Sequence, residues 1–77
     1  MSIENKVKEA FLDVLKVQES AYDSELAVGD IPEWDSVNHV KLLQEIEERF
    51  NISIEVADAI DIEDISDLIL TVKKYTN

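Results

Sequence analysis

The chain has 77 residues, of which seven are basic and 18 are acidic, and its formal net charge is −11 at pH 7. This acidity argues against a nucleic acid or an anionic membrane as a partner, because phosphate groups would repel the protein. The chain has no cysteine, which excludes disulfides, thiolate metal sites and a cysteine nucleophile. No apolar run approaches the roughly 18 residues of a membrane span, and no signal-peptide pattern is present. We therefore expect a single cytoplasmic domain over residues 1–77.

The composition favours a folded, helical protein. An apolar fraction of 45% is sufficient for a packed core despite the charge, and the single Gly and single Pro favour helices over hairpins. The first predicted helix covers residues 3–17, where apolar side chains recur at helical spacing behind Ser2 as N-cap. Residues 18–35 lack such a stripe and are predicted to form an ordered loop. Several apolar side chains can attach this loop to the core: Tyr22, Leu26, Val28, Ile31 and Trp34.

Two helices and one shorter helical segment are predicted after the loop. One helix covers residues 36–50, with Asp35 as N-cap and Asn51 as a left-handed C-cap. Residues 56–60 have room for only a short helical segment, and the apolar stripe over residues 64–75 predicts the last helix. The expected fold is all-α. It is a small up-and-down bundle of three main helices and one short helix, with a long first loop.

The segment Trp34-Asp35-Ser36-Val37 puts a serine at the predicted start of the second helix. Unpaired N–H groups and the helix dipole favour a phosphate there, so the geometry suits a phosphodiester on Ser36. Ordinary helix capping explains the same residues without a ligand. His39 is the only histidine and could serve Ser36 as a base, but no nucleophile-elbow motif surrounds the serine and no pocket is expected in so small a domain. We therefore expect His39 at the surface or its boundary, and no catalytic residue.

An acidic run begins just after the second helix and contains no basic residue. A calcium loop of the EF-hand type needs oxygen ligands at alternate positions and a central glycine. Counted from Asp58, the alternate positions are Ile60 and Ile62, which cannot ligate, and the run has no glycine, so no metal site is predicted. Two interpretations stay open: a solvated acidic face, or an acidic interaction or calcium-responsive module without a prosthetic group. The members of the run are Glu55, Asp58, Asp61, Glu63, Asp64 and Asp67.

The order of these elements resembles that of the acyl carrier proteins. The resemblance covers nearly the whole chain and is strongest from Trp34 through Ile54, the stretch WDSVNHVKLLQEIEERFNISI. It implies a four-helix bundle with a 4′-phosphopantetheine group, which a phosphopantetheinyl transferase would join from coenzyme A to Ser36 through a phosphate. The thiol of this group would carry an acyl or aminoacyl cargo as a thioester, so the protein would be a carrier and not an enzyme.

The resemblance also implies roles for other positions. Asp35 and Val37 would present the serine to the transferase, and the second helix would be the main docking surface. The residues implied in docking are Val37, Val40, Lys41, Glu47 and Glu48. An acyl chain would pack against apolar residues that otherwise form core: Leu43, Ile46, Ile54, Ile62 and Leu68.

The sequence departs from the fatty-acid-synthesis pattern at three positions. Trp34 stands where a small residue is usual, and Asn38 and Lys41 stand where docking acids are common. The preferred interpretation is therefore a free-standing carrier of a specialised pathway, such as polyketide, nonribosomal peptide or surface-polysaccharide assembly, and the alternative is a fatty-acid-synthesis carrier. The expected partners are the phosphopantetheinyl transferase, an acyl-loading ligase or acyltransferase, and a downstream synthase or transferase. We expect the carrier to be a monomer.

Overall fold

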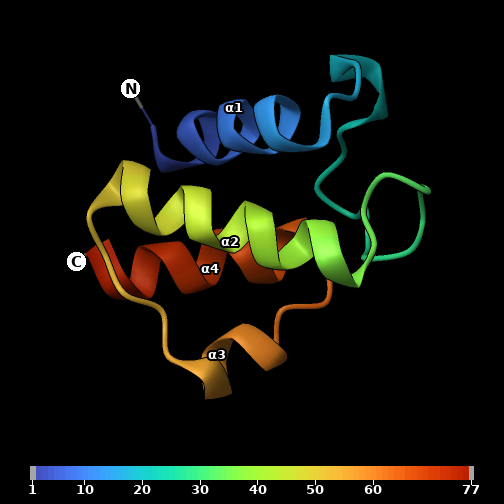
Figure 1. Cartoon of the computed structure of the whole chain (residues 1–77). Helices are drawn as coiled ribbons and strands as arrows, with labels where there is room; N and C mark the ends of the chain where they lie inside the picture. The colour runs from blue at the N-terminus through green and yellow to red at the C-terminus, as the bar shows by residue number, and fades with distance from the viewer. Residues whose placement is uncertain (1, 77) are drawn as a thin grey trace.

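The computed structural model describes residues 2–76, which form an all-α bundle as predicted. Figure 1 shows α1, α2 and α4 packed along one another and the short α3 at one side of the bundle. The only β-type backbone pairing among the described residues is an isolated antiparallel bridge between Ala27 and Asp64. The elements are α1 (Ile3–Leu15), the short 3-10 helix η1 (Glu19–Ala21), α2 (Ser36–Phe50), α3 (Val56–Ile60) and α4 (Ile65–Thr76).

The directions of the helices differ from the predicted up-and-down order. At one end of the bundle, Lys73 near the end of α4 forms an ion pair with Glu4 at the start of α1. At the same end, Lys6 of α1 lies over the ring of Phe50, the last residue of α2. Both α2 and α4 are therefore antiparallel to α1 and run in the same direction (Figure 1). This arrangement is possible because the connection that contains α3 is long enough to cross the bundle before α4 begins.

Side-chain caps explain where the first two long helices begin. The Ser2 hydroxyl accepts the N–H of Asn5 at the start of α1, and a carboxylate oxygen of Asp35 accepts the N–H of Asn38 at the start of α2 (2.8 Å). Helix α1 ends at Leu15, two residues earlier than predicted, because Lys16 adopts the left-handed conformation (φ 55°). The predicted range of α2 and its left-handed cap at Asn51 are confirmed.

The last two helices also lie close to their predicted ranges. Helix α3 covers the predicted residues, and α4 begins one residue later and ends one residue later than expected. A carboxylate oxygen of Asp64 accepts the N–H of Asp67, which caps the start of α4. The side chain of Tyr75 in α4 joins the two helices, because its hydroxyl donates to Asp58 and accepts the N–H of Glu55 (3.1 Å).

The long loop before α2 is ordered, as predicted, and its main anchor is Trp34. The Trp34 ring is fully buried and packs edge-on against Phe11 of α1, with ring centroids 5.1 Å apart. Backbone hydrogen bonds also join the loop to the start of α4, from Val28 to Glu63 and from Ile65 to Leu26. The loop therefore holds Ser36 at a defined position beside the bundle. The buried apolar residues of the core are Val7, Ala10, Phe11, Leu15, Trp34, Leu42, Ile46, Ile62, Ile65, Leu68 and Val72.

Candidate functional site

Ser36 is the first residue of α2, and it is exposed. The N–H groups in the first turn of a helix have no partner within the helix, and the helix dipole gives this end a partial positive charge. The Asp35 carboxylate accepts a hydrogen bond from one of these groups, the N–H of Asn38. Asn38 in turn donates its side-chain amide to the carbonyl oxygen of Glu33, which fixes the loop against the helix (2.7 Å). The Ser36 hydroxyl is thus held at a helix end that favours an attached phosphate.

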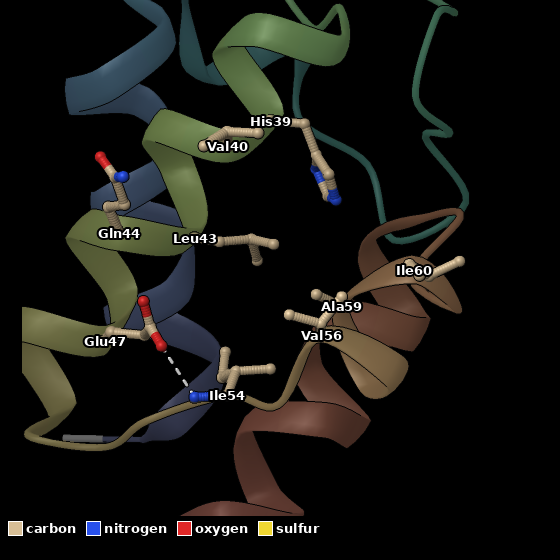
Figure 2. A pocket seen from close by; sticks show the side chains of 9 residues that line it. All are labelled: His39, Val40, Leu43, Gln44, Glu47, Ile54, Val56, Ala59 and Ile60. Atoms are coloured by element: carbon tan, nitrogen blue, oxygen red, sulfur yellow. Dashed lines mark hydrogen bonds between the residues drawn. The ribbon is translucent and has the colours of Figure 1, made fainter.

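Two cavities lie next to each other beside this serine. The first, of about 680 Å³, is bounded by Ser36, by the loop residues Ala27 and Val28, and by the end of α3. The second, of about 380 Å³, lies between α2 and α3 and has a mostly apolar lining (Figure 2). The cavities share three lining residues and therefore adjoin each other, and we call the two together the α2–α3 groove. Its shared residues are His39, Ala59 and Ile60.

This groove corrects the expectation that so small a domain has no pocket. The expectation rested on the small size of the domain. Helix α3 instead lies to one side and leaves the faces of Val56 and Ile60 uncovered, with 74% and 73% of these residues exposed. The groove is therefore a consequence of how the short helix packs.

His39 joins the core to the groove. Its Nδ1 accepts a hydrogen bond from the indole N–H of Trp34 at 3.1 Å. Its Nε2 is buried and has no hydrogen-bond partner among the described residues. Burial lowers the pKa of the imidazole, because desolvation disfavours its charged form. The predicted boundary position of His39 agrees with its half-buried side chain, and neither ring nitrogen is hydrogen-bonded to Ser36.

The residues that the family resemblance implied in packing against cargo fall into two groups. Leu43 and Ile54 line the groove between α2 and α3, and Figure 2 shows both side chains pointing into it. Ile62 lines the part of the groove next to Ser36. Ile46 and Leu68 are fully buried in the core and line neither cavity. The structure therefore brings three of the five residues to the groove.

The residues implied in docking lie mostly on the exposed side of α2. Val37 and Val40 are 64% and 55% exposed, and Lys41 and Glu48 are also exposed. Glu47 is half-buried, because its carboxylate accepts the backbone N–H of Ile54 at 2.8 Å and holds the connector against α2 (Figure 2).

Sequence reasoning missed the contribution of α3. Val56 and Ile60 are exposed apolar residues that line the groove from α3, and Figure 2 shows the Val56 side chain directed toward α2. Their spacing of four residues indicated a common helix face, but core packing predicts the same spacing. Gln44 also lines the groove and was not singled out.

Residues 2–76 have neither a metal site nor a membrane span. No group of three or more His, Asp or Glu side chains converges on a point where a metal ion could be held. No helix in this range has both the length and the apolar character required to cross a membrane.

Comparison with known protein families agrees with this geometry. Residues 5–72 match the family model described as the phosphopantetheine attachment site. The match covers all four α-helices except the first two residues of α1 and the last turn of α4, and it includes the whole groove. The protein therefore belongs to this family of the acyl carrier protein type, and it is a carrier that bears a covalently attached 4′-phosphopantetheine.

Proposed function

We propose that Ser36 carries the 4′-phosphopantetheine through a phosphodiester bond to its hydroxyl oxygen. The observation that carries this proposal is that Ser36 is exposed at the start of α2 and is the only serine that lines the groove among the described residues. A phosphate on this hydroxyl would lie at the partially positive end of the helix. Other serines are used elsewhere; the Ser66 hydroxyl, for example, donates to the carbonyl oxygen of Ser24.

The groove beside Ser36 fits a long, flexible prosthetic group. It begins at the serine and continues between α2 and α3 as a mostly apolar surface. When bound, the group supplies a thiol that holds an acyl or aminoacyl cargo as a thioester, and this chain has no cysteine of its own. Leu43, Ile54 and Ile62 would shield an aliphatic cargo from water, which is favourable because apolar surface is buried. Ile46 and Leu68 would contact such a cargo only if the core opened.

We infer that partner enzymes dock on the exposed apolar residues that flank the groove. Asp35 and Val37 would present Ser36, while Val40 and Lys41 of α2 and the apolar residues of α3 would form the contact surface. Glu48 would contribute charge at the far end of α2, and Glu47 would act mainly by holding the connector. These partners are a phosphopantetheinyl transferase, an acyl-loading ligase or acyltransferase, and a downstream synthase or transferase.

Two residues of α2 support a specialised pathway over fatty-acid synthesis. Asn38 is committed to a hydrogen bond that closes the loop, and Lys41 introduces a positive charge on the docking side. The negative charge of this helix face is therefore interrupted at both positions. Partners that require a continuous acidic strip would dock less well, because charge complementarity guides such encounters. The protein is then a non-catalytic carrier for polyketide, nonribosomal peptide or surface-polysaccharide assembly.

Intact-mass measurement tests the attachment site. The protein is co-expressed with a broad-specificity phosphopantetheinyl transferase, and the expected result is a mass increase of one phosphopantetheine. Ser36→Ala should abolish the increase while the circular dichroism spectrum remains helical. Ser53→Ala, an exposed serine outside the groove, is the matched control and should be modified like the wild type. No mass increase in the wild type, or an increase that survives Ser36→Ala, would overturn the proposal.

A further inference from the structure

The hydrogen bond between Trp34 and His39 determines which nitrogen of the imidazole carries the proton. The indole N–H of Trp34 can only donate, so Nδ1 of His39 must accept with its lone pair (3.1 Å). In the neutral imidazole the proton is then on Nε2. Burial keeps the ring neutral by lowering its pKa. His39 is therefore held as a neutral ring with an Nε2–H donor.

This donor has no partner among the described residues. The Nε2 atom is buried, and an unsatisfied buried donor is costly, so native structures rarely leave one without a partner. His39 lines both parts of the α2–α3 groove. Figure 2 shows its ring extending from α2 into the space between α2 and α3. Because Nε2 has almost no exposed surface, an acceptor from outside the chain reaches it only when a group that enters the groove displaces the side chains that cover it.

The surroundings indicate what kind of acceptor this is. The groove is mostly apolar, and the carboxylates that line it belong to Glu47 and Glu63, which would repel an anion. The acceptor must therefore be able to accept a hydrogen bond from Nε2 and must carry no negative charge. A neutral carbonyl oxygen has both properties. An amide carbonyl of the prosthetic group and the thioester carbonyl of its cargo share this chemistry.

We propose that His39 donates a hydrogen bond from Nε2 to a carbonyl oxygen lying in the α2–α3 groove, and that Trp34 acts as the positioning residue that fixes this donor. The proposal rests on the proposed attachment of the prosthetic group at Ser36. It assigns Trp34 a role beyond core packing, since the indole N–H selects the tautomer that can donate into the groove.

Nuclear magnetic resonance of isotope-labelled histidine tests the donor directly. Three forms are compared: the unmodified protein, the phosphopantetheinylated protein, and the protein loaded from octanoyl-coenzyme A. We expect the Nε2–H tautomer in all three forms. If an arm amide is the acceptor, the Nε2–H signal shifts on phosphopantetheinylation; if the thioester is the acceptor, it shifts only on octanoylation. An Nδ1–H tautomer, or no shift in either loaded form, would contradict the proposal.

Two substitutions of His39 separate its two hydrogen bonds. Gln has an amide nitrogen that can reach the position of Nε2, whereas the shorter Asn has an oxygen that can replace Nδ1 as the acceptor for Trp34. The readout is the carbonyl resonance of an isotope-labelled octanoyl thioester and of the arm amides. In the wild type, the resonance of one of these carbonyls should be shifted by the hydrogen bond from His39. This shift should be retained in His39→Gln and lost in His39→Asn. Equal shifts in the two variants would exclude His39 as the donor.

Trp34→Phe tests the positioning role, because it removes the N–H and keeps an aromatic ring in the core. We expect a mixture of both imidazole tautomers in this variant in place of one, and an unchanged single tautomer would contradict the role of Trp34. If this variant does not fold, the comparison of the two His39 variants still decides the donor. Intact mass is recorded for every sample, so failure to attach the prosthetic group is distinguished from failure of His39 to contact it.

Discussion

Adjacent residues at the start of α2 have different physical tasks. Trp34 belongs to the core and Ser36 to the surface, and Asp35 between them caps the helix. The cap fixes the backbone at the point where the loop becomes helix, so it fixes the position of the serine. An Asp at an N-cap and an Asp that meets a partner enzyme therefore have the same sequence signature but respond differently to substitution.

Asp35→Ala should lower the free energy of unfolding by about 1 kcal/mol, because the N–H of Asn38 loses its acceptor. Asp35→Asn keeps an oxygen at the cap and should leave the stability nearly unchanged. Urea denaturation followed by circular dichroism measures both values. A loss of modification by the transferase in Asp35→Asn, at wild-type stability, would identify a presenting role for the charge. Equal destabilisation by the two substitutions would contradict the capping role.

His39 should make stability depend on pH in the range where histidine titrates. Burial lowers the pKa of His39 in the folded protein from the ordinary value of 6.5. Just below pH 6.5, His39 therefore binds a proton more readily in the unfolded chain than in the folded protein. The contribution of the neutral His39 to the free energy of unfolding is fully present above pH 6.5. It is lost as pH falls toward the lower pKa that His39 has in the folded protein. As the pH is lowered through this interval, the urea concentration at the midpoint of unfolding should fall in the wild type and should fall less in His39→Gln. Parallel curves for the two proteins would exclude His39 as the cause.

At the scale of elements, the short helix α3 decides whether a groove exists. It has a single turn and a half of helix, contributes no fully buried side chain, and leaves two apolar residues exposed. Its attachment to α4 depends on the polar contacts of Asp58. The Tyr75 hydroxyl and the Lys74 ammonium both donate to this carboxylate and hold its pKa below the usual range. Motion of α3 relative to α2 would change the width of the groove between them.

Tyr75→Phe should loosen α3, because it removes the donor to Asp58 and the acceptor of the Glu55 N–H. We expect faster amide hydrogen exchange over Val56–Ile60, with exchange in α1 and α2 little changed. Tyr22→Phe is the matched control, since its buried hydroxyl has no partner among the described residues and its removal should not destabilise the fold. Unchanged exchange in α3 of Tyr75→Phe would show that apolar packing alone holds this helix.

At the scale of the whole molecule, charge is the dominant feature. Acidic residues outnumber basic ones by 18 to seven, so many carboxylates have no cation with which to pair. The charge is also uneven, with −3 over residues 1–29 and −8 over residues 30–77. The ion pairs present are partly exposed, as between Lys8 and Glu19, and pairs of this kind stabilise a protein only weakly. Mutual repulsion of carboxylates therefore acts against the folded state, while the same field would attract partners with basic surfaces.

The melting temperature should therefore rise with salt, because screening weakens repulsion among the acidic residues. Magnesium chloride should raise it more steeply than sodium chloride at equal ionic strength, since a divalent cation neutralises charge more effectively. Differential scanning calorimetry measures the two slopes. Glu48→Gln, which removes one exposed charge of α2, should have a smaller slope than the wild type. A flat response to both salts would mean that repulsion makes no significant contribution.

Much of the secondary structure could be predicted because it depends on neighbours in the sequence. Asp35 and Asn51 mark the ends of α2 through contacts within four residues, and both caps lie where predicted. The early end of α1 at Leu15 was missed because Lys16 carries no sequence signal for a left-handed conformation. The prediction that the main helices alternate in direction was wrong. Apolar periodicity indicates which face of a helix is buried, but it does not indicate the direction in which the helix runs.

Sequence alone was sufficient to predict an all-α bundle with a serine at a capped helix start, because helices and caps are encoded in local spacing. The acyl carrier type followed from the resemblance to that family, which is strongest from Trp34 through Ile54. Only the tertiary structure decided that α2 and α4 are parallel, that α3 leaves a groove open beside Ser36, and that His39 lines this groove with a buried nitrogen that has no partner among the described residues. The physical reason is that burial is a property of the assembled chain. Trp34 is covered by Phe11 of a distant helix, and the groove exists only where α3 approaches α2.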